Sequence, residues 1–223
     1  MRERRQVRQR ILERPRSRQA HEKVLDAAIE LFAARGIEGT SIDAIAAESG
    51  VSKATIYKHW ADKNALCLEV LGRVHGLDRK SPEFNSGDLL QDIIDFLDHK
   101  PPEEYSSIRE KLMPHLISYA SRDREFGMAW KSRVIEPGRA KAVELMQRGI
   151  ASGVLSPELD VSLGTALLIG PMAYKHFARG ISSVPENLAE GVAKAFWRAF
   201  ATGKGRTGGR LQSGSQAARR DTQ

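Results

Sequence analysis

The stretch TSIDAIAAESGVSKATIYKHWADK, residues 40–63, decides how this chain folds. Its first half places Ile42, Ile45 and Ala46 at helical spacing, so that they form one apolar side. Gly50 follows where a helix often ends in a left-handed backbone conformation, which glycine adopts without strain. The stretch therefore predicts two short helices joined by a tight turn, the layout of a helix-turn-helix that places one helix in the major groove of DNA.

Hydroxyl side chains mark the starts of the two helices. Thr40 and Ser41 can cap the first and Ser52 the second, because a side-chain oxygen accepts hydrogen bonds from the backbone N–H groups that a helix leaves unpaired. In the second helix, Ile56 and Trp60 stand four residues apart, so both can face a small core.

The other side of the second helix carries residue types that reach DNA. Lysine supplies a charge for phosphate or a donor for guanine, threonine can contact a base, and tyrosine and histidine can donate to phosphate oxygens. A third helix is expected to begin after Asp62, with Lys63 in its first turn, where an anion such as phosphate would be favoured. The candidates are Lys53, Thr55, Tyr57, Lys58, His59 and Lys63.

A helix is expected before this stretch, over residues 21–36. Val24, Ala28, Leu31 and Phe32 share one side of it, and Gly36 closes it. An isolated helix-turn-helix pattern also fits an ordinary helical hairpin with solvated charges. The preceding helix has the right length to complete a three-helix DNA-binding unit and favours that interpretation.

The run KVLDAAIELFAARGIEGTSIDAIAAESGVSKATIYKHWADKNALCLEVL resembles the DNA-binding domain of the TetR family of transcriptional regulators over about residues 20–70. Trp60 stands where the family more often has phenylalanine. The matching positions are Ala28, Leu31, Phe32, Gly36, Thr40, Ile45, Ala46, Gly50, Val51, Ser52, Thr55, Ile56, Tyr57, Trp60, Lys63 and Leu66.

The resemblance implies a role for each DNA-facing residue. Residues matching Thr40, Tyr57, His59 and Lys63 mostly touch phosphates in the family, whereas those matching Ser52, Lys53, Thr55 and Lys58 lie nearest the bases. The predicted DNA-binding set is Thr40, Ser41, Ser52, Lys53, Thr55, Tyr57, Lys58, His59 and Lys63.

The net charge of +7 is concentrated at the two ends of the chain. Residues 1–18 hold eight arginines against two glutamates, and residues 203–223 hold five lysines or arginines against one aspartate. Residues 20–66 are acidic, with five lysines or arginines against seven acidic residues. The first segment is predicted to be a flexible arm that contacts DNA, with a solvated tail or a membrane-surface segment as alternatives.

The rest of the sequence favours an all-α, cytoplasmic protein without a membrane span. No apolar run reaches the length that crosses a bilayer, and the Arg-rich N-terminus has no apolar signal-peptide core. The lone Cys67 cannot form an internal disulfide. The predicted domains are a basic arm (1–19), the helix-turn-helix domain (20–66), a helical ligand-binding and dimerisation domain (67–202) and a disordered basic tail (203–223).

The segment after residue 67 reads as helices separated by Pro and Gly. Helices are expected over residues 63–75, 89–97, 103–121, 125–135, 138–152, 161–179 and 186–201. The last two carry broad apolar sides, formed by Leu163, Ala166, Leu167, Gly170, Ala173, Tyr174 and Phe177, and by Ala193, Phe196, Trp197 and Phe200. This region also resembles the part of TetR-type proteins that forms a four-helix interface between two subunits, so a homodimer through 161–179 and 186–201 is expected. The alternative is that both sides pack within their own domain.

The resemblance also implies a small-molecule effector that binds the C-terminal domain. Methionine and aromatic side chains suit an adaptable apolar pocket, although each can equally be part of an ordinary core. The candidate pocket residues are Met113, Leu116, Tyr119, Phe126, Trp130, Met146, Met172 and Tyr174.

The sequence holds no motif of an enzyme or a metal site, and the literal G-x-G-x-x-G at residues 203–208 is rejected as a dinucleotide site because no strand precedes it and no helix clearly follows it. HExxH, P-loop, GxSxG and zinc-spaced Cys/His patterns are absent. We therefore expect a non-enzymatic, homodimeric, ligand-responsive transcriptional regulator, most simply a repressor of a palindromic operator. A DNA-binding regulator or an architectural DNA binder without a ligand is the alternative.

Overall fold

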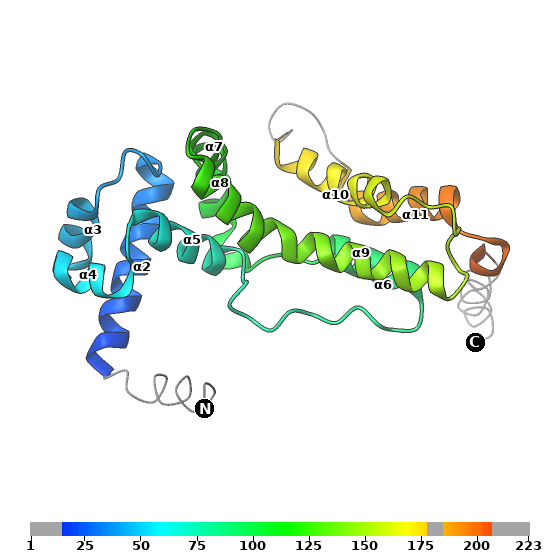
Figure 1. The fold of residues 1–223 in the computed structure, drawn as a ribbon, viewed down its shortest axis with the longest axis horizontal. Coiled ribbons are helices and arrows are strands. Elements are labelled where there is room, and N and C mark those ends of the chain that lie inside the picture. Colours follow the sequence, from blue (N-terminus) through cyan, green and yellow to red (C-terminus); the bar gives the residue numbers. More distant parts are fainter. Residues whose placement is uncertain (1–14, 178–184, 207–223) are drawn as a thin grey trace, which may run out of the picture. The chain divides into compact units, whose positions relative to one another are not determined.

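The computed structural model describes residues 15–177 and 185–206, and helices dominate them (Figure 1). Within these residues no β-strand forms, and Leu155 and Ala201 make an isolated antiparallel bridge. The all-α prediction is confirmed. The elements are α2 (Pro15–Arg35), α3 (Ile42–Ser49), α4 (Lys53–His59), α5 (Lys63–Val74), α6 (Leu89–Asp98), the 3₁₀ turn η1 (Glu103–Tyr105), α7 (Ser106–Arg122), α8 (Arg124–Trp130), the π-turn η2 (Lys131–Ile135), α9 (Glu136–Ala151), α10 (Val161–Phe177) and α11 (Leu188–Phe200).

The chain divides into two compact units that do not coincide with the expected domain ranges. Unit 1 contains the residues up to Lys80 and Pro101–Val134, and unit 2 contains Ser81–Lys100 and the residues from Ile135 onward. The difference arises because α5, α7 and α8 bury their apolar sides in the same core as α2, α3 and α4. The functions assigned to the ranges 20–66 and 67–202 stay predictions.

The helix-turn-helix forms as its local signals predict. Ser41 Oγ accepts a hydrogen bond from Ala44 N at the start of α3, and Gly50 ends that helix with φ of +66°. Ser52 caps α4 in the same way, and Asp62 caps α5 through Ala65 N at 2.7 Å.

Two segment boundaries differ from the expectation. The first helix begins at Pro15, so residues 15–19, assigned to a flexible arm, are helical, because proline is well suited to the first turn of a helix. At the other end, residues 203–206 form a helical turn in place of the predicted disordered tail, and Lys204 Nζ donates to Ser152 O at 2.9 Å. Residues 1–14 and 207–223 of those predicted segments lie outside the described residues.

Pro137 does not end a helix, although the sequence suggested that it would. The chain stays helical from α8 through η2 into α9, and Pro137 occupies the first turn of α9. A proline lacks the backbone N–H that a first-turn residue would leave unpaired in any case, so the position tolerates it.

The core of unit 1 is built around α2. Leu25, Ala28 and Phe32 are completely buried there, together with Ile45 of α3 and Ile56 of α4. The hydroxyl of Thr40 is also buried and donates to the carbonyls of Gly36 (2.8 Å) and Leu31 (3.2 Å). The three-helix unit is therefore fixed by apolar contacts and by a satisfied polar group at the turn between α2 and α3.

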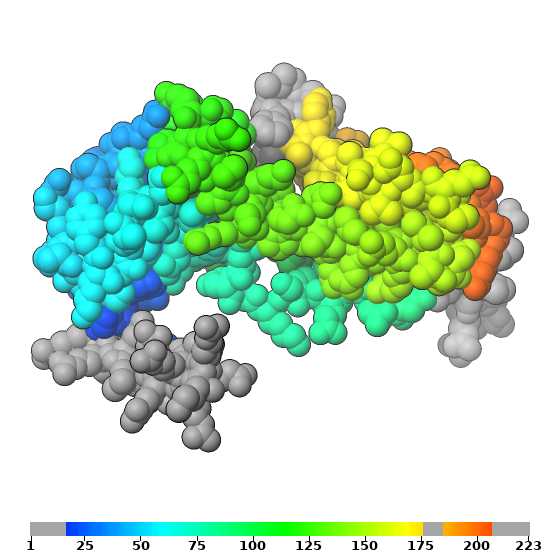
Figure 2. Space-filling model, viewed as in Figure 1, coloured from blue at the N-terminus to red at the C-terminus, as the bar shows by residue number. Residues whose placement is uncertain are grey.

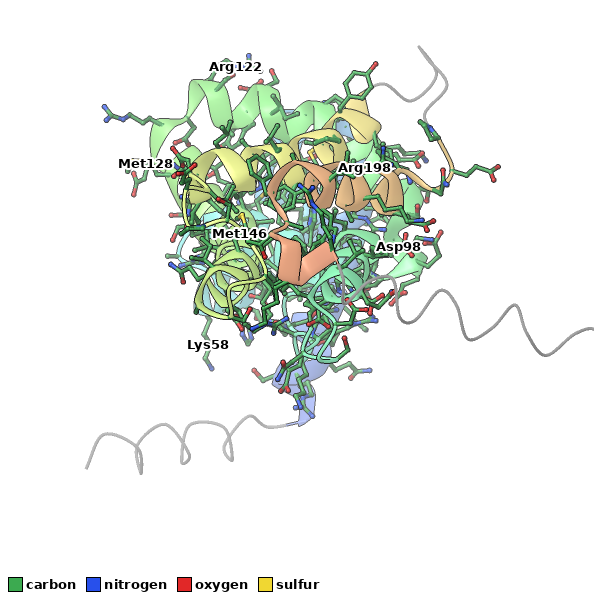
Figure 3. The ribbon with its side chains drawn as sticks, turned by 90° about the vertical axis from the view of Figure 1, so that its right-hand side faces the viewer. Lys58, Asp98, Arg122, Met128, Met146 and Arg198 are labelled. Carbon is green, nitrogen blue, oxygen red and sulfur yellow. The ribbon has the colours of Figure 1, made fainter. Side chains whose placement is uncertain are left out.

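Unit 2 consists of α6, α9, α10 and α11 around a second core. Ile93, Leu145, Met146, Leu168 and Ala193 are buried in it. Figure 3 labels Met146, which is buried in this core, and Met128, which belongs to α8 of unit 1 and is 59% exposed. Among the described residues, no helix is both long and apolar enough to cross a membrane.

The left-handed Gly36 yields a test of the fold. Its φ is +75°, and a Cβ at this position would lie 2.8 Å from Nδ1 of His115. We expect Gly36→Ala to lower the free energy of unfolding by about 1–3 kcal/mol, measured by urea denaturation, because L-residues are strained there and the imidazole must move. Gly72→Ala is the control, since a Cβ in this helical position meets no atom within 4 Å and should add about 0.5–1 kcal/mol. Equal stabilities for the two variants would contradict the described turn.

Candidate nucleic-acid interface

The solvent side of α4 holds most of the predicted DNA contacts. Ile56 is fully buried, whereas Tyr57 is 53% exposed and Lys58 extends away from the ribbon in Figure 3. Figure 2 shows α3 and α4, in blue to cyan, at the surface of unit 1. Thr55 Oγ1 lies 3.0 Å from the capping Ser52 Oγ, so both hydroxyls sit together at the start of the helix.

Lys53, the first residue of α4, forms an ion pair with Asp43 in the first turn of α3. Lys53 Nζ lies 2.7 Å from Asp43 Oδ1, and both side chains are exposed. The hydrogen bond that Lys53 donates to Asp43 raises the pKa of Lys53, and the negative charge of Asp43 acts in the same direction. Lys53 is therefore a cation that already has a protein partner before any DNA arrives.

Thr40 and Ser41 have structural roles in the protein itself. Because the Thr40 side chain is completely buried and donates to two carbonyls, its hydroxyl is not placed to contact a phosphate. The family-implied phosphate role of Thr40 would have to come from its backbone. Ser41 is exposed, but its Oγ caps α3.

Lys63 ties α5 to the turn that precedes α3. Its Nζ donates to the carbonyls of Ile37 (2.8 Å) and Thr40 (3.1 Å), and lies 5.9 Å from the centre of the Tyr119 ring. The ammonium group therefore links α5 to the turn between α2 and α3, in addition to the phosphate contact predicted for it.

An aromatic cluster supports the C-terminal end of α4. The ring of His21 stacks on Trp60 with centroids 4.7 Å apart, and the indole N–H of Trp60 donates to Glu69 Oε2 at 2.7 Å. His59 Nε2 lies 3.2 Å from Ser17 Oγ of α2. Ser17, His21 and Glu69 carried no sequence signal, because the partners of Ser17 and His21 lie 42 and 39 residues away and the partner of Glu69 lies beyond the end of another helix.

Ionised partners reinforce α2 and α5 behind this cluster. Arg73 donates to both carboxylate oxygens of Glu22, at 2.6 and 3.1 Å. This hydrogen bonding lowers the pKa of Glu22 and raises that of Arg73. Burial raises the pKa of the Cys67 thiol to about 12, so this cysteine is a packed, protonated side chain.

The candidate pocket residues are divided between the two units. Leu116 and Phe126 are buried in the core of unit 1, and Met113, Tyr119 and Trp130 pack against it. Met146 is buried in unit 2, Met172 packs against its core, and Tyr174 is 58% exposed. They do not form one cluster within either unit, so the predicted pocket stays a prediction.

Unit 2 contains a cavity of about 430 Å³ that none of those candidates lines. Its most buried polar group is Asp92, which pairs with Arg148 and accepts a hydrogen bond from Ser86 N at 2.8 Å. Arg148 also donates to Phe84 O at 2.7 Å. The lining residues are Asn85, Gly87, Asp88, Leu89, Asp92, Arg148, Ser152, Val154, Trp197, Lys204 and Gly205.

The two C-terminal helices differ in what they expose. On α10, Leu163, Leu167 and Tyr174 are 54%, 45% and 58% exposed, and with the exposed Gly170 they follow one side of the helix. On α11, Ala193 and Phe196 of the predicted apolar side are buried within unit 2. Ala193 and Phe196 of α11 therefore pack within the domain, Trp197 and Phe200 are partly buried, and the exposed apolar strip lies on α10.

Comparisons with known proteins match both parts of the chain. Residues 24–70 match the family model described as bacterial regulatory proteins, tetR family, and residues 85–196 match the model described as tetracyclin repressor-like, C-terminal domain. The uncharacterized HTH-type transcriptional regulator YdeS of Bacillus subtilis is 29% identical over 168 residues, covering 75% of this chain and 83% of that protein.

Solved structures share the fold. The flavonoid-responsive regulator FrrA gives a TM-score of 0.63 at 23% identity, covering 82% of this chain and 98% of that chain. A transcriptional regulator from Saccharomonospora viridis, solved in complex with choline, gives a TM-score of 0.63 at 18% identity, with the same coverage. At these identities the likeness concerns the fold.

The two roles of Lys63 can be separated experimentally. Lys63→Met removes the donor to two carbonyls, and we expect it to lower the free energy of unfolding by about 1–3 kcal/mol in addition to weakening DNA binding. Lys58→Met, at an exposed position, should weaken DNA binding and leave the unfolding midpoint within experimental error. Chemical denaturation and fluorescence anisotropy with a labelled duplex measure the two effects. An unchanged stability of Lys63→Met would contradict the bridging role.

Proposed function

Since the chain belongs to the TetR family of DNA-binding transcriptional regulators, we propose that it is a homodimeric repressor that a small molecule releases from a palindromic operator. The observation that carries the proposal is the solvent side of α4, where hydroxyl, ammonium and phenol groups project from a short helix whose opposite side is buried. These are the groups that contact phosphates and base edges in the major groove.

The contacts divide by their position on α4. Lys53 and Thr55, in its first turn, and Lys58 are proposed to lie nearest the bases, together with the capping Ser52. Tyr57 and His59 are proposed to contact phosphates. In helix-turn-helix proteins the N-terminal residues of the recognition helix contact base edges, which supports this division.

The exposed side of α10 supports the dimer. Leu163, Leu167, Gly170 and Tyr174 leave an apolar strip that a second copy of the chain can cover, and Gly170 permits a close approach of helices. We propose that α10 and α11 of two subunits form a four-helix interface. A two-fold dimer presents two α4 helices to DNA, so the operator would be a palindrome with half-sites about 34–36 Å apart or at a wider spacing.

We place the effector in the cavity of unit 2, as an alternative to the pocket predicted from methionine and aromatic residues, because those residues are divided between the two units. Its volume of about 430 Å³ lies in the range of small-molecule sites, and it combines Trp197, Leu89 and Val154 with the polar Arg148 and Lys204. The flavonoid-responsive FrrA and the choline-bound regulator are fold relatives for which small molecules are named. An effector would release the operator if it bound more tightly to the conformation that has lower affinity for DNA.

The experiment that tests the proposal is a selection of genome fragments by the purified protein, read by sequencing. Enrichment of a palindrome would support a sequence-specific dimer, and a reporter gene placed behind it would give the sign of regulation. Enrichment without a shared motif would instead favour an architectural DNA binder. A selected operator that no compound in a broad library releases would favour the regulator without a ligand.

The dimer interface can be broken with one charge. Leu167→Glu places a carboxylate in the apolar strip, so we expect monomers by analytical ultracentrifugation and an operator affinity lower by roughly tenfold or more. The side chain is 45% exposed within the chain, so folding should be retained. Gln147→Glu adds the same charge at an exposed position of α9 and should stay dimeric. A dimeric Leu167→Glu protein with full operator affinity would rule out this interface.

The cavity can be filled without altering α4. For any library compound that releases the operator, Ser152→Trp should weaken the release by roughly tenfold or more, since the indole occupies the ligand's space. Operator affinity without the compound should remain unchanged. Ala151→Trp, exposed on α9 and outside the lining, is the matched control. Equal responses of both variants would place the effector elsewhere.

A further inference from the structure

We propose that Asp43 is a specificity-determining residue. Its ion pair with Lys53 makes a contact between Lys53 and a phosphate of non-specific DNA energetically unfavourable. Lys53 therefore binds DNA fully at sequences where a base accepts a hydrogen bond from it. The inference rests on the proposed base-reading role of Lys53. It adds an acidic residue on α3 to a DNA-binding set that otherwise consists of cationic and neutral side chains.

The first observation is the geometry of the pair. Lys53 Nζ and Asp43 Oδ1 are 2.7 Å apart, and the two residues come from the two helices of the helix-turn-helix. Asp43 is therefore held beside the start of the recognition helix. Its side chain is 73% exposed and Lys53 is 55% exposed, so neither is buried by the protein.

The second observation is that the Asp43–Lys53 ion pair is expected to contribute little to the free energy of folding. Exposed ion pairs contribute little to folding, because water screens them and both side chains lose freedom. Lys53 is also the first residue of α4, where the helix dipole disfavours a cation. Asp43 offsets that local cost and leaves the lysine pointing at a carboxylate rather than at open solvent.

On DNA the pair has to be exchanged. If Lys53 moves to a phosphate, it loses one anion and gains another, while Asp43 is left unpaired facing a polyanion. If Lys53 instead donates to a guanine edge, the contacted acceptor is neutral, so the unpaired carboxylate is repelled less by that group than by a contacted phosphate. The carboxylate thus penalises the wrong sites more than the right one, which is how an unfavourable element increases discrimination.

The balance of charge around α4 agrees with this role. Residues 20–66 carry seven acidic residues against five lysines or arginines, so the DNA-binding segment is not built for general attraction to phosphate. Glu48, also exposed on α3, has no ion-pair partner in the described part of the chain. It stands five residues from Asp43, on a different side of the helix, and provides a matched charge control.

The test compares Asp43→Asn with Glu48→Gln in the full-length protein. Binding to a scrambled duplex is measured by fluorescence anisotropy over a series of salt concentrations, and binding to the selected operator is measured alongside. We expect Asp43→Asn to bind the scrambled duplex roughly threefold to tenfold more tightly. The plot of log binding constant against log salt concentration should become steeper by about 0.9, the change that one additional phosphate contact gives. Discrimination between operator and scrambled duplex should fall, and Glu48→Gln should change the slope little.

A double-mutant cycle shows whether Asp43 acts through Lys53. In a protein that also carries Lys53→Met, Asp43→Asn should change binding to the scrambled duplex no more than Glu48→Gln does. Asp43→Ser provides a second neutral variant with a residue suited to a helix start, in case Asn alters the cap. Circular dichroism confirms that each variant is folded.

Three results would overturn the proposal. The first is an Asp43→Asn effect equal to that of Glu48→Gln, and the second is an excess effect that persists without Lys53. The third is a loss of preference at a single operator position with unchanged scrambled-duplex binding, which would mean that Asp43 accepts a hydrogen bond directly from a cytosine. If instead the proposed DNA-binding role of Lys53 were wrong, the result would differ from these three: Lys53→Met alone would leave binding to both duplexes unchanged.

Discussion

The burial of one side of α4 is the constraint on which the DNA-facing surface depends. A helix of seven residues is too short to persist by itself in water. It persists here because Ile56 is fully buried and Trp60, just beyond its end, is 4% exposed in the core shared with α2, α3 and α5. The positions of the side chains on the other side of α4 depend on that contact. Apolar packing behind the interface therefore determines where its polar groups lie.

The local features of this fold were predictable because they depend on neighbouring residues. The caps at Ser41, Ser52 and Asp62 and the left-handed Gly50 lie where the sequence places them, since each is set by contacts within a few positions. The continuation of helix through Pro137 was missed, because a proline signals a helix end and a first helical turn equally well.

The parts of the site that could not be predicted depend on residues far apart in the chain. Lys63 donates a hydrogen bond to the carbonyl of Ile37, 26 positions away in the chain. No periodicity of the sequence predicts a hydrogen bond from a side chain to a distant backbone group. The cavity of unit 2 is lined largely by loop and turn residues such as Asn85, Gly87 and Lys204, which have no regular spacing. The predicted pocket residues are divided between the two cores, because methionine and aromatic side chains also fill ordinary cores.

The buried thiol of Cys67 has a practical consequence. A pKa of about 12 keeps it protonated at neutral pH, and its side chain is fully enclosed, so maleimides and similar reagents should leave the folded protein unlabelled. Because the sequence has one cysteine, a second one introduced at an exposed position such as Lys58 would be the reactive thiol. A fluorophore or photocrosslinker attached there would report on α4 without labelling of Cys67, so Cys67 would not have to be replaced first.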